Sequence, residues 1–261
     1  MIAASVAAGA ALAQWGWRGV PPRFPEEGFR PDGSFAFCRA FYTQVRRERL
    51  GQGWYTDYPD SDHNLTIRLA EVTLAPVRRD ANGEPDHVVV RFTDSELLVH
   101  PFLFLSDAGT VGLSGEEAAS LRLYLLKGGF LWVDDFWGES AWAHWQSEIA
   151  GVLPEYPIVD VAPEHPIFHV FFDVPEVPQV PSIQHWYRSG GGTSELGAES
   201  AEPHLRGIFD EHGRLLVLMS HNTDIADGWE REGESAEYFE LFSIPKSYPL
   251  GINVVLHSLM R

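Results

Sequence analysis

Apolar and polar positions alternate along the chain with two different periods, which predicts strands and helices in turn. Residues 35–42, FAFCRAFY, alternate residue by residue in the manner of a strand. Residues 63–73, HNLTIRLAEVT, instead place Leu65, Leu69 and Val72 at helical spacing. A strand followed by a helix is the repeating pattern of an α/β domain.

Residues 101–135 contain the clearest unit of this alternation. PFLFLSDAG predicts an apolar strand, and Ser114 and Glu117 have the spacing of a capping box at the start of a helix. LRLYLLKGG then ends that helix at Gly128 and Gly129, and FLWVDD predicts a second strand. A strand–helix–strand crossover requires its two strands to be parallel and neighbouring, or nearly so.

Two adjacent carboxylates, Asp134 and Asp135, end this second strand. Open parallel sheets bind ligands at the carboxyl ends of their strands, and residues 137–154 predict the next helix, so the pair lies at a strand-to-helix elbow. One aspartate there commonly caps the helix or accepts hydrogen bonds from loop amides. Two such charges repel, so we expect that one has a raised pKa, that the side chains point to opposite sides, or that a cation or a positively charged side chain lies between them.

A second polar cluster follows the apolar strand LLVLMS. It contains His221, Asn222, Asp224, Asp227, Trp229 and Glu230. These residue types offer proton transfer, amide hydrogen bonds, acidic ligands and an aromatic platform. The alternative is a structural loop that Trp229 holds to the core.

A third polar stretch, GWYTDYPDSDHN at residues 53–64, holds Asp57 and Asp62 among aromatic side chains. Its simplest interpretation is a solvated turn in which Asp62 or Asn64 caps the following helix. Residues 189–204, SGGGTSELGAESAEPH, predict a flexible loop and match no phosphate-binding pattern.

Composition limits the classes of partner. The 261 residues are 44% hydrophobic and 13% aromatic, which is ample for a globular core. Nineteen basic and 37 acidic side chains give a formal charge of -18, which repels phosphate backbones and excludes nucleic acid as an expected partner. The single cysteine, Cys38, forms no internal disulfide and is expected to be a buried, inert thiol.

The beginning of the chain predicts export. Residues 1–14 are a small-residue apolar run that contains Ala11-Leu12-Ala13, as in a signal peptide, although no Lys or Arg precedes the run. A plain apolar helix is the alternative. Residues 15–32, rich in proline, then predict a linker, and residues 33–261 a single α/β domain. We therefore expect a periplasmic protein without a mature membrane span.

Six motifs, in their order along the chain, resemble one bacterial family. They are FAFCRAFY, TDYPDSDHNL, PFLFLSDAG, LSGEEAASLRLYLLKGGFLWVDD, EHPIFH and SHNTDIADGWE. Together they resemble the bacterial domain of unknown function numbered 4159, over roughly residues 33–261. That family is similar in outline to class I glutamine amidotransferase-like domains and to trehalose-utilisation-type proteins. The resemblance implies a flavodoxin-like, three-layer α/β sandwich with a mostly parallel central sheet.

The same analogy gives Asp134 and Asp135 the position of the amidotransferase nucleophilic cysteine, and His221 that of the later triad histidine. No cysteine stands in this elbow, and Cys38 is far upstream. Glutamine hydrolysis through a thioester is therefore excluded unless a carboxylate replaces the thiol, which is poor chemistry for amides at neutral pH.

Three functions remain open. In the first, an exported domain binds a polar ligand, such as a carbohydrate, at the carboxyl ends of the strands. In the second, a hydrolase uses Asp134 or Asp135 as base or nucleophile, with His221 as its proton-transfer partner. The third is a non-catalytic scaffold that binds partners in an envelope protein complex.

The candidate site residues form two groups. The candidate catalytic residues are Asp134, Asp135, His221 and Asn222, and the candidate ligand-binding residues are Asp57, Trp137, Asp227, Trp229 and Glu230. No organic cofactor is expected. A variant of the hydrolase places Ca²⁺ or Mg²⁺ among Asp134, Asp135, Asp224 or Asp227, because hard cations choose oxygen ligands. Spacing along the sequence does not establish such a site.

Overall fold

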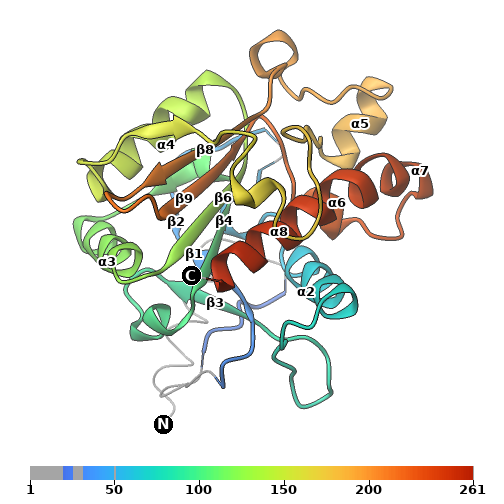
Figure 1. Cartoon of the computed structure of the whole chain (residues 1–261). Helices are drawn as coiled ribbons and strands as arrows, with labels where there is room; N and C mark the ends of the chain where they lie inside the picture. The colour runs from blue at the N-terminus through green and yellow to red at the C-terminus, as the bar shows by residue number, and fades with distance from the viewer. Residues whose placement is uncertain (1–19, 26–31, 50, 261) are drawn as a thin grey trace.

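A seven-stranded sheet forms the centre of the protein in a computed structural model that describes residues 20–25, 32–49 and 51–260 (Figure 1). Its strands, in spatial order, are β3 (His87–Arg91), β1 (Phe37–Phe41), β4 (Phe102–Ser106), β6 (Phe130–Phe136), β9 (Leu215–His221), β8 (His204–Phe209) and β7 (Ile158–Asp160). The first five run parallel, and β8 and β7 extend the sheet as antiparallel strands. A small separate sheet pairs β2 (Thr43–Gln44) with β5 (Val111–Gly112).

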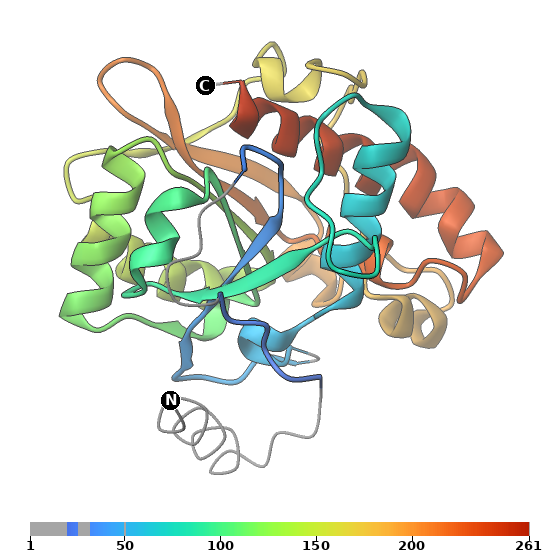
Figure 2. The ribbon, with the colours of Figure 1, turned by 90° about the horizontal axis from the view of Figure 1, so that it is seen from below.

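Helices cover both faces of the sheet, which makes the three-layer α/β sandwich that the sequence predicted (Figure 2). The helices α3 (Gly115–Leu126) and α4 (Gly138–Val152) pack on one face. The other face carries α2 (Asp60–Val72), α5 (Ile183–Ser189), α6 (Asp227–Glu230) and α8 (Tyr248–Leu259). A short helix, α7 (Ala236–Tyr238), and a π-helix over Phe239–Ser247 lead into α8.

The central strands are buried on both faces, which is why their sequences read as continuous apolar runs. All residues of β4, β6 and β9 are buried. The predicted crossover is confirmed, since β4 and β6 are parallel neighbours in register from Phe102–Phe130 to Ser106–Asp134. Cys38 is a buried free thiol, as expected.

The start of α3 is stabilised by the predicted capping box. The Ser114 hydroxyl accepts a hydrogen bond from the Glu117 amide at 3.2 Å, and the Glu117 carboxylate accepts one from the Ser114 amide at 2.8 Å. Replacing Ser114 by alanine is expected to lower the free energy of unfolding by about 1 kcal/mol, because one helix amide loses its partner. Urea denaturation measures the change, and an unaltered midpoint would contradict a stabilising role for the cap.

The start of α2 corrects one prediction. The helix begins at Asp60 after Pro59, and no side chain caps it, so neither Asp62 nor Asn64 is the cap. Asp62 is fully buried and instead forms an ion pair with Arg39. Asn64 donates through its side-chain amide to the Trp229 carbonyl at 2.7 Å. The buried charge of Arg39 requires a buried carboxylate, and that requirement overrides the capping preference of Asp62.

The segment at residues 20–25 lies against the edge strand β3. The Val89 amide donates to the Arg23 carbonyl at 2.9 Å, and the Val20 amide donates to the Tyr55 hydroxyl at 2.9 Å. The predicted signal peptide, residues 1–14, lies outside the described residues. In the part of the chain that the structure describes, no helix has both the length and the apolar character needed to cross a membrane.

Candidate functional site

Four residues with left-handed backbones surround the carboxyl ends of the parallel strands. Asp107, Asp135 and Asn222 lie at the ends of β4, β6 and β9, and Asp57 lies in the loop before α2. They are the only non-glycine residues with positive φ among those that the structure describes. Such conformations are uncommon outside glycine, and they gather where a fold places functional groups. This edge of the sheet is therefore the first candidate for a site.

A β-bulge at the end of β6 separates the two adjacent aspartates. The register between β6 and β9 shifts between Val133 and Phe136, and Asp135 has a φ of 53°. Asp134 stays on the sheet face that α6 covers, where it accepts a hydrogen bond from the Ala226 amide at 2.9 Å. Asp135 instead accepts one from the Trp137 indole at 3.1 Å. The bulge gives the two carboxylates different surroundings, which reduces the cost of placing them next to each other.

Asp135 opens into a small acidic cleft of about 40 Å³ at the carboxyl edge of the sheet. The cleft is lined by Gln52, Thr56, Asp57, Asp135, Ser182, Gln184, Glu195, Asp224, Asp227 and Arg231. The five carboxylates are buried, Gln52 and Gln184 are exposed at the rim, and Arg231 is half-buried. A volume of this size holds an ion with a few waters, or one or two functional groups of a larger ligand.

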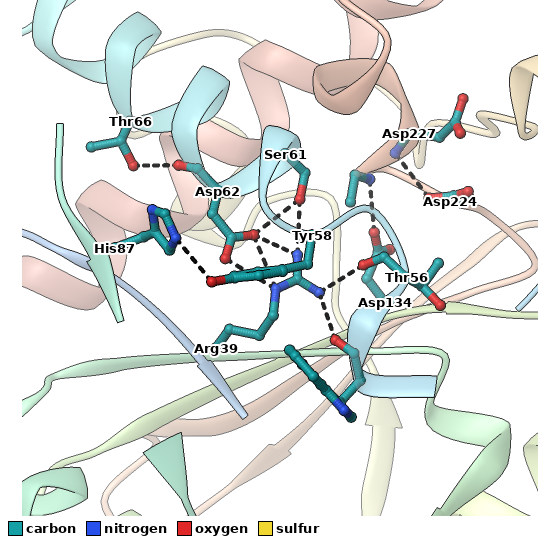
Figure 3. A network of polar contacts seen from close by, with 12 residues as sticks. Arg39, Thr56, Tyr58, Ser61, Asp62, Thr66, His87, Asp134, Asp224 and Asp227 are labelled. Carbon is teal, nitrogen blue, oxygen red and sulfur yellow. Dashed lines mark hydrogen bonds and ion pairs between the residues drawn. The ribbon is translucent and has the colours of Figure 1, made fainter. Parts of the chain in front are cut away.

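Arg39 holds the loop that carries Asp57 through hydrogen bonds to two backbone carbonyls (Figure 3). The Arg39 guanidinium donates to the carbonyls of Trp54 at 3.3 Å and Thr56 at 2.8 Å, on the residues just before Asp57. Its Nε contacts both carboxylate oxygens of Asp62 at 3.0 Å. A buried ion pair thus determines where the loop lies, and with it the position of the Asp57 carboxylate.

Asp224 lies in the loop that follows β9, and Asp227 is the first residue of α6. One oxygen of Asp224 accepts the Asp227 amide at 2.9 Å. One oxygen of Asp227 accepts the Ile183 amide at 2.8 Å and the Tyr238 hydroxyl at 2.9 Å. These bonds orient both carboxylates, and the second oxygen of Asp227 lies 3.7 Å from the Arg231 Nε.

Burial raises the pKa of every cleft aspartate. The pKa of Asp57, Asp135 and Asp224 is held well above its ordinary value, first by loss of solvation and then by the neighbouring carboxylates. Burial raises the pKa of Asp227 to about 6, although two hydrogen bonds and Arg231 oppose the shift. Asp134 is not part of the cleft lining, and burial raises its pKa to about 7. The pKa values of both adjacent aspartates are thus raised, first by burial, and repulsion between the two carboxylates is not the main cause.

His221 lies on the opposite sheet face from Asp134 and outside the cleft lining. Its ring stacks on Trp142 of α4 at 5.1 Å. Arg206 donates to Nδ1 at 3.1 Å, and Nε2 donates to the Gly138 carbonyl at 3.2 Å, so both ring nitrogens are engaged. Burial lowers its pKa to about 4, which leaves the ring neutral at neutral pH. This geometry gives no support to proton transfer between His221 and either aspartate of the elbow.

The other candidate residues lie around the cleft. Asn222 accepts a hydrogen bond from the Gly138 amide at 2.8 Å and connects β9 to the start of α4. Trp137 orients Asp135, as described above. Trp229 is fully buried and packs on Trp132 at 5.5 Å, so it offers no exposed aromatic face. Glu230 is half-buried beside Arg231, outside the cleft lining.

Sequence reasoning did not single out six lining residues. They are Gln52, Thr56, Ser182, Gln184, Glu195 and Arg231. Glu195 lies in the glycine-rich segment that was predicted to be a flexible loop, where it accepts a hydrogen bond from the Ser182 amide at 2.8 Å. A lone glutamate in such a stretch carries no pattern, whereas Arg231 adjoins the polar cluster after β9 and could have been included with it.

Comparison with known proteins identifies one family. The family model described as Domain of unknown function (DUF4159) matches residues 42–259. Most of the motif FAFCRAFY precedes the matched region, and the other five motifs fall within it. No match is found among curated proteins.

Proposed function

Since the chain belongs to the DUF4159 family, a domain of unknown function, we propose from the geometry of the cleft that the protein is a binding domain for a polar, hydroxyl-rich ligand. The ligand class that fits is a carbohydrate or similar polyol. It would bind at the acidic cleft, with hydroxyl groups directed at the carboxylates and the rest of the molecule at the rim.

The observation that carries this proposal is the lining of the cleft. Carboxylates and amides accept hydrogen bonds from hydroxyl groups, and the cleft combines five buried carboxylates with two exposed glutamines, Gln52 and Gln184. An anionic ligand is disfavoured, because Arg231 is the only basic residue in the lining. The aromatic platform that we expected from Trp229 makes no contribution, since that residue is fully buried.

Hydrolysis by an aspartate–histidine pair is not supported as an alternative. His221 is neutral, engaged at both nitrogens and absent from the cleft lining. Export to the periplasm is part of the proposal and rests on the composition of residues 1–14. An extracytoplasmic location is consistent with a carbohydrate ligand.

Calorimetric titration with a panel of monosaccharides and disaccharides tests the proposal. At least one sugar is expected to bind, and Asp135→Asn is expected to weaken that binding at least tenfold, because an acceptor oxygen of the carboxyl group is replaced by an NH₂ group that can only donate. Asp160→Asn is the control, since the Asp160 side chain is 80% exposed on β7 and outside the cleft lining. Equal binding by the wild type and Asp135→Asn would place the ligand elsewhere.

A further inference from the structure

We propose that the floor of the cleft is a site for a hard divalent cation, Ca²⁺ or Mg²⁺, with Asp57, Asp224 and Asp227 as its protein ligands. This inference deepens the proposed function and rests on the same cleft, but cation binding itself requires no sugar. The cation would be the group that the polar ligand meets at the bottom of the cleft.

The spacing of the three carboxylates fits one ion. One oxygen from each lies within 4.8 Å of the others. Oxygen ligands lie about 2.3–2.6 Å from Ca²⁺, so two ligands on opposite sides of the ion are roughly 4.8 Å apart. The three carboxylates are therefore close enough to share one Ca²⁺, with at most small side-chain movements toward the ion. Asp135 and Glu195 line the same cleft, so further carboxylate oxygens are present in it.

An unsatisfied oxygen points independently to a ligand. Asp57 is only 6% exposed, yet its Oδ2 atom is buried and has no hydrogen-bond partner among the described residues. Leaving a buried carboxylate oxygen without a partner costs roughly 1–3 kcal/mol or more. Asp57 also has a left-handed backbone, held by the Arg39 network. A bound cation would provide the missing partner.

The protein's own cations do not neutralise the cleft. Arg231 is the only basic residue in the lining, and its Nε lies 3.7 Å from Asp227 but 2.6 Å from Glu230, which lies outside the cleft lining. Arg39 is already engaged by Asp62 and by loop carbonyls. The five buried carboxylates therefore have one basic side chain among them, Arg231, and Arg231 also pairs with Glu230. Such an arrangement favours uptake of a cation.

The donor atoms indicate which class of cation would bind. The acidic side chains in the lining would all bind a cation through carboxylate oxygens, and the lining contains neither histidine nor cysteine. Oxygen-only sites suit Ca²⁺ and Mg²⁺, whereas zinc and copper sites use nitrogen or sulfur ligands. The free volume leaves room for waters on the ion, and these are the positions that ligand hydroxyls would replace.

Calorimetric titration of the EDTA-treated full chain with CaCl₂ and with MgCl₂, in the absence of sugar, tests the inference. One ion per chain is expected to bind, and Asp57→Asn is expected to weaken binding at least tenfold. Asparagine tolerates the left-handed backbone, so this variant is expected to fold. Asp224→Asn is a second variant from a different element, and Asp160→Asn is the exposed control.

Two results would overturn the cation site. One is the absence of binding heat and of any thermal shift in the wild type up to about 10 mM of either ion, above the range of weak protein sites. The other is unchanged affinity in both Asp57→Asn and Asp224→Asn, with circular dichroism showing that both variants are folded.

The sugar panel, repeated in CaCl₂ and in EDTA, separates this inference from the proposed function. Cation binding without binding of any sugar supports the cation site and overturns the proposed function. Sugar binding that is equal in CaCl₂ and EDTA, with no binding of cation, supports the proposed function and overturns the cation site. Sugar binding only with CaCl₂ supports both.

Discussion

Replacing Arg39 by methionine is expected to lower the free energy of unfolding by about 3–5 kcal/mol, because the change leaves the Asp62 charge buried without a partner. Both side chains are fully buried. The loop carbonyls of Trp54 and Thr56 would also lose their donor. Urea denaturation measures the loss, and cation titration of the same variant measures the effect on the Asp57 loop.

A double variant separates the two effects of Arg39. In Arg39→Met with Asp62→Leu both members of the ion pair are removed and neither leaves an unpaired charge, so we expect most of the lost stability to return. The donor to Thr56 is still missing, so cation affinity should stay low. If the single and double variants are equally destabilised, the unpaired charge is not the cause, and the loss comes from packing or from the loop.

Asp107→Asn is expected to make the metal-free protein more stable at alkaline pH and to leave its stability near pH 4 almost unchanged. Asp107 follows β4, and burial, together with the nearby Glu48, raises its pKa to about 8. At pH 9 the gain should exceed about 1.4 kcal/mol, the free energy of a single pKa unit. The hydrogen bond from the Gly53 amide to Asp107, 2.6 Å long, can be accepted equally by the asparagine oxygen.

The sign follows from the two pKa values. In the unfolded chain Asp107 loses its proton near its ordinary value of 3.8, whereas the folded protein retains it up to about 8. The folded state therefore holds the additional proton between these values, and its stability falls as pH rises through that window. Asparagine does not titrate, so the variant lacks this contribution.

Thermal unfolding in EDTA across pH 4–9, for the wild type and Asp107→Asn, measures the difference. The wild type should lose stability relative to the variant steadily as pH rises. Asp94→Asn serves as control, because Asp94 accepts a hydrogen bond from the Arg91 amide near the end of β3 and is not buried. Parallel curves for wild type and Asp107→Asn would show that Asp107 ionises normally in the folded protein.

The layers of the fold and the edge that carries the cleft could be predicted from local pattern. Ser114, Glu117 and Gly128 mark the two ends of α3, so the chain reveals the β4–α3–β6 crossover without tertiary information. The positions where the apolar runs stop then predict the carboxyl ends of the parallel strands. The strand ends predicted in this way include Asp135 after one strand and Asp224 and Asp227 after another. The structure brings these three residues together in the cleft.

The remaining parts of the site depend on contacts that local pattern does not contain. Asp62 pairs with a residue 23 positions away, although the single charge of Arg39 within an apolar strand was a signal that a buried partner exists. The composition of LWVDDFWGES does not indicate the bulge at Asp135. Glu195 reaches the cleft from a glycine-rich segment. His221 was expected near the aspartates because both follow strands and because the amidotransferase analogy gave it the position of the triad histidine.

The four left-handed residues also affect how alanine scanning of this protein should be read. Alanine in a left-handed backbone costs roughly 1–2 kcal/mol, whereas asparagine and aspartate adopt it readily. An alanine at Asp57 or Asp135 therefore changes both the local backbone energy and the carboxylate, and reduced ligand binding could come from either. Aspartate-to-asparagine changes keep the backbone preference and replace the carboxylate by an amide, so they measure the chemistry of the side chain without the added backbone cost.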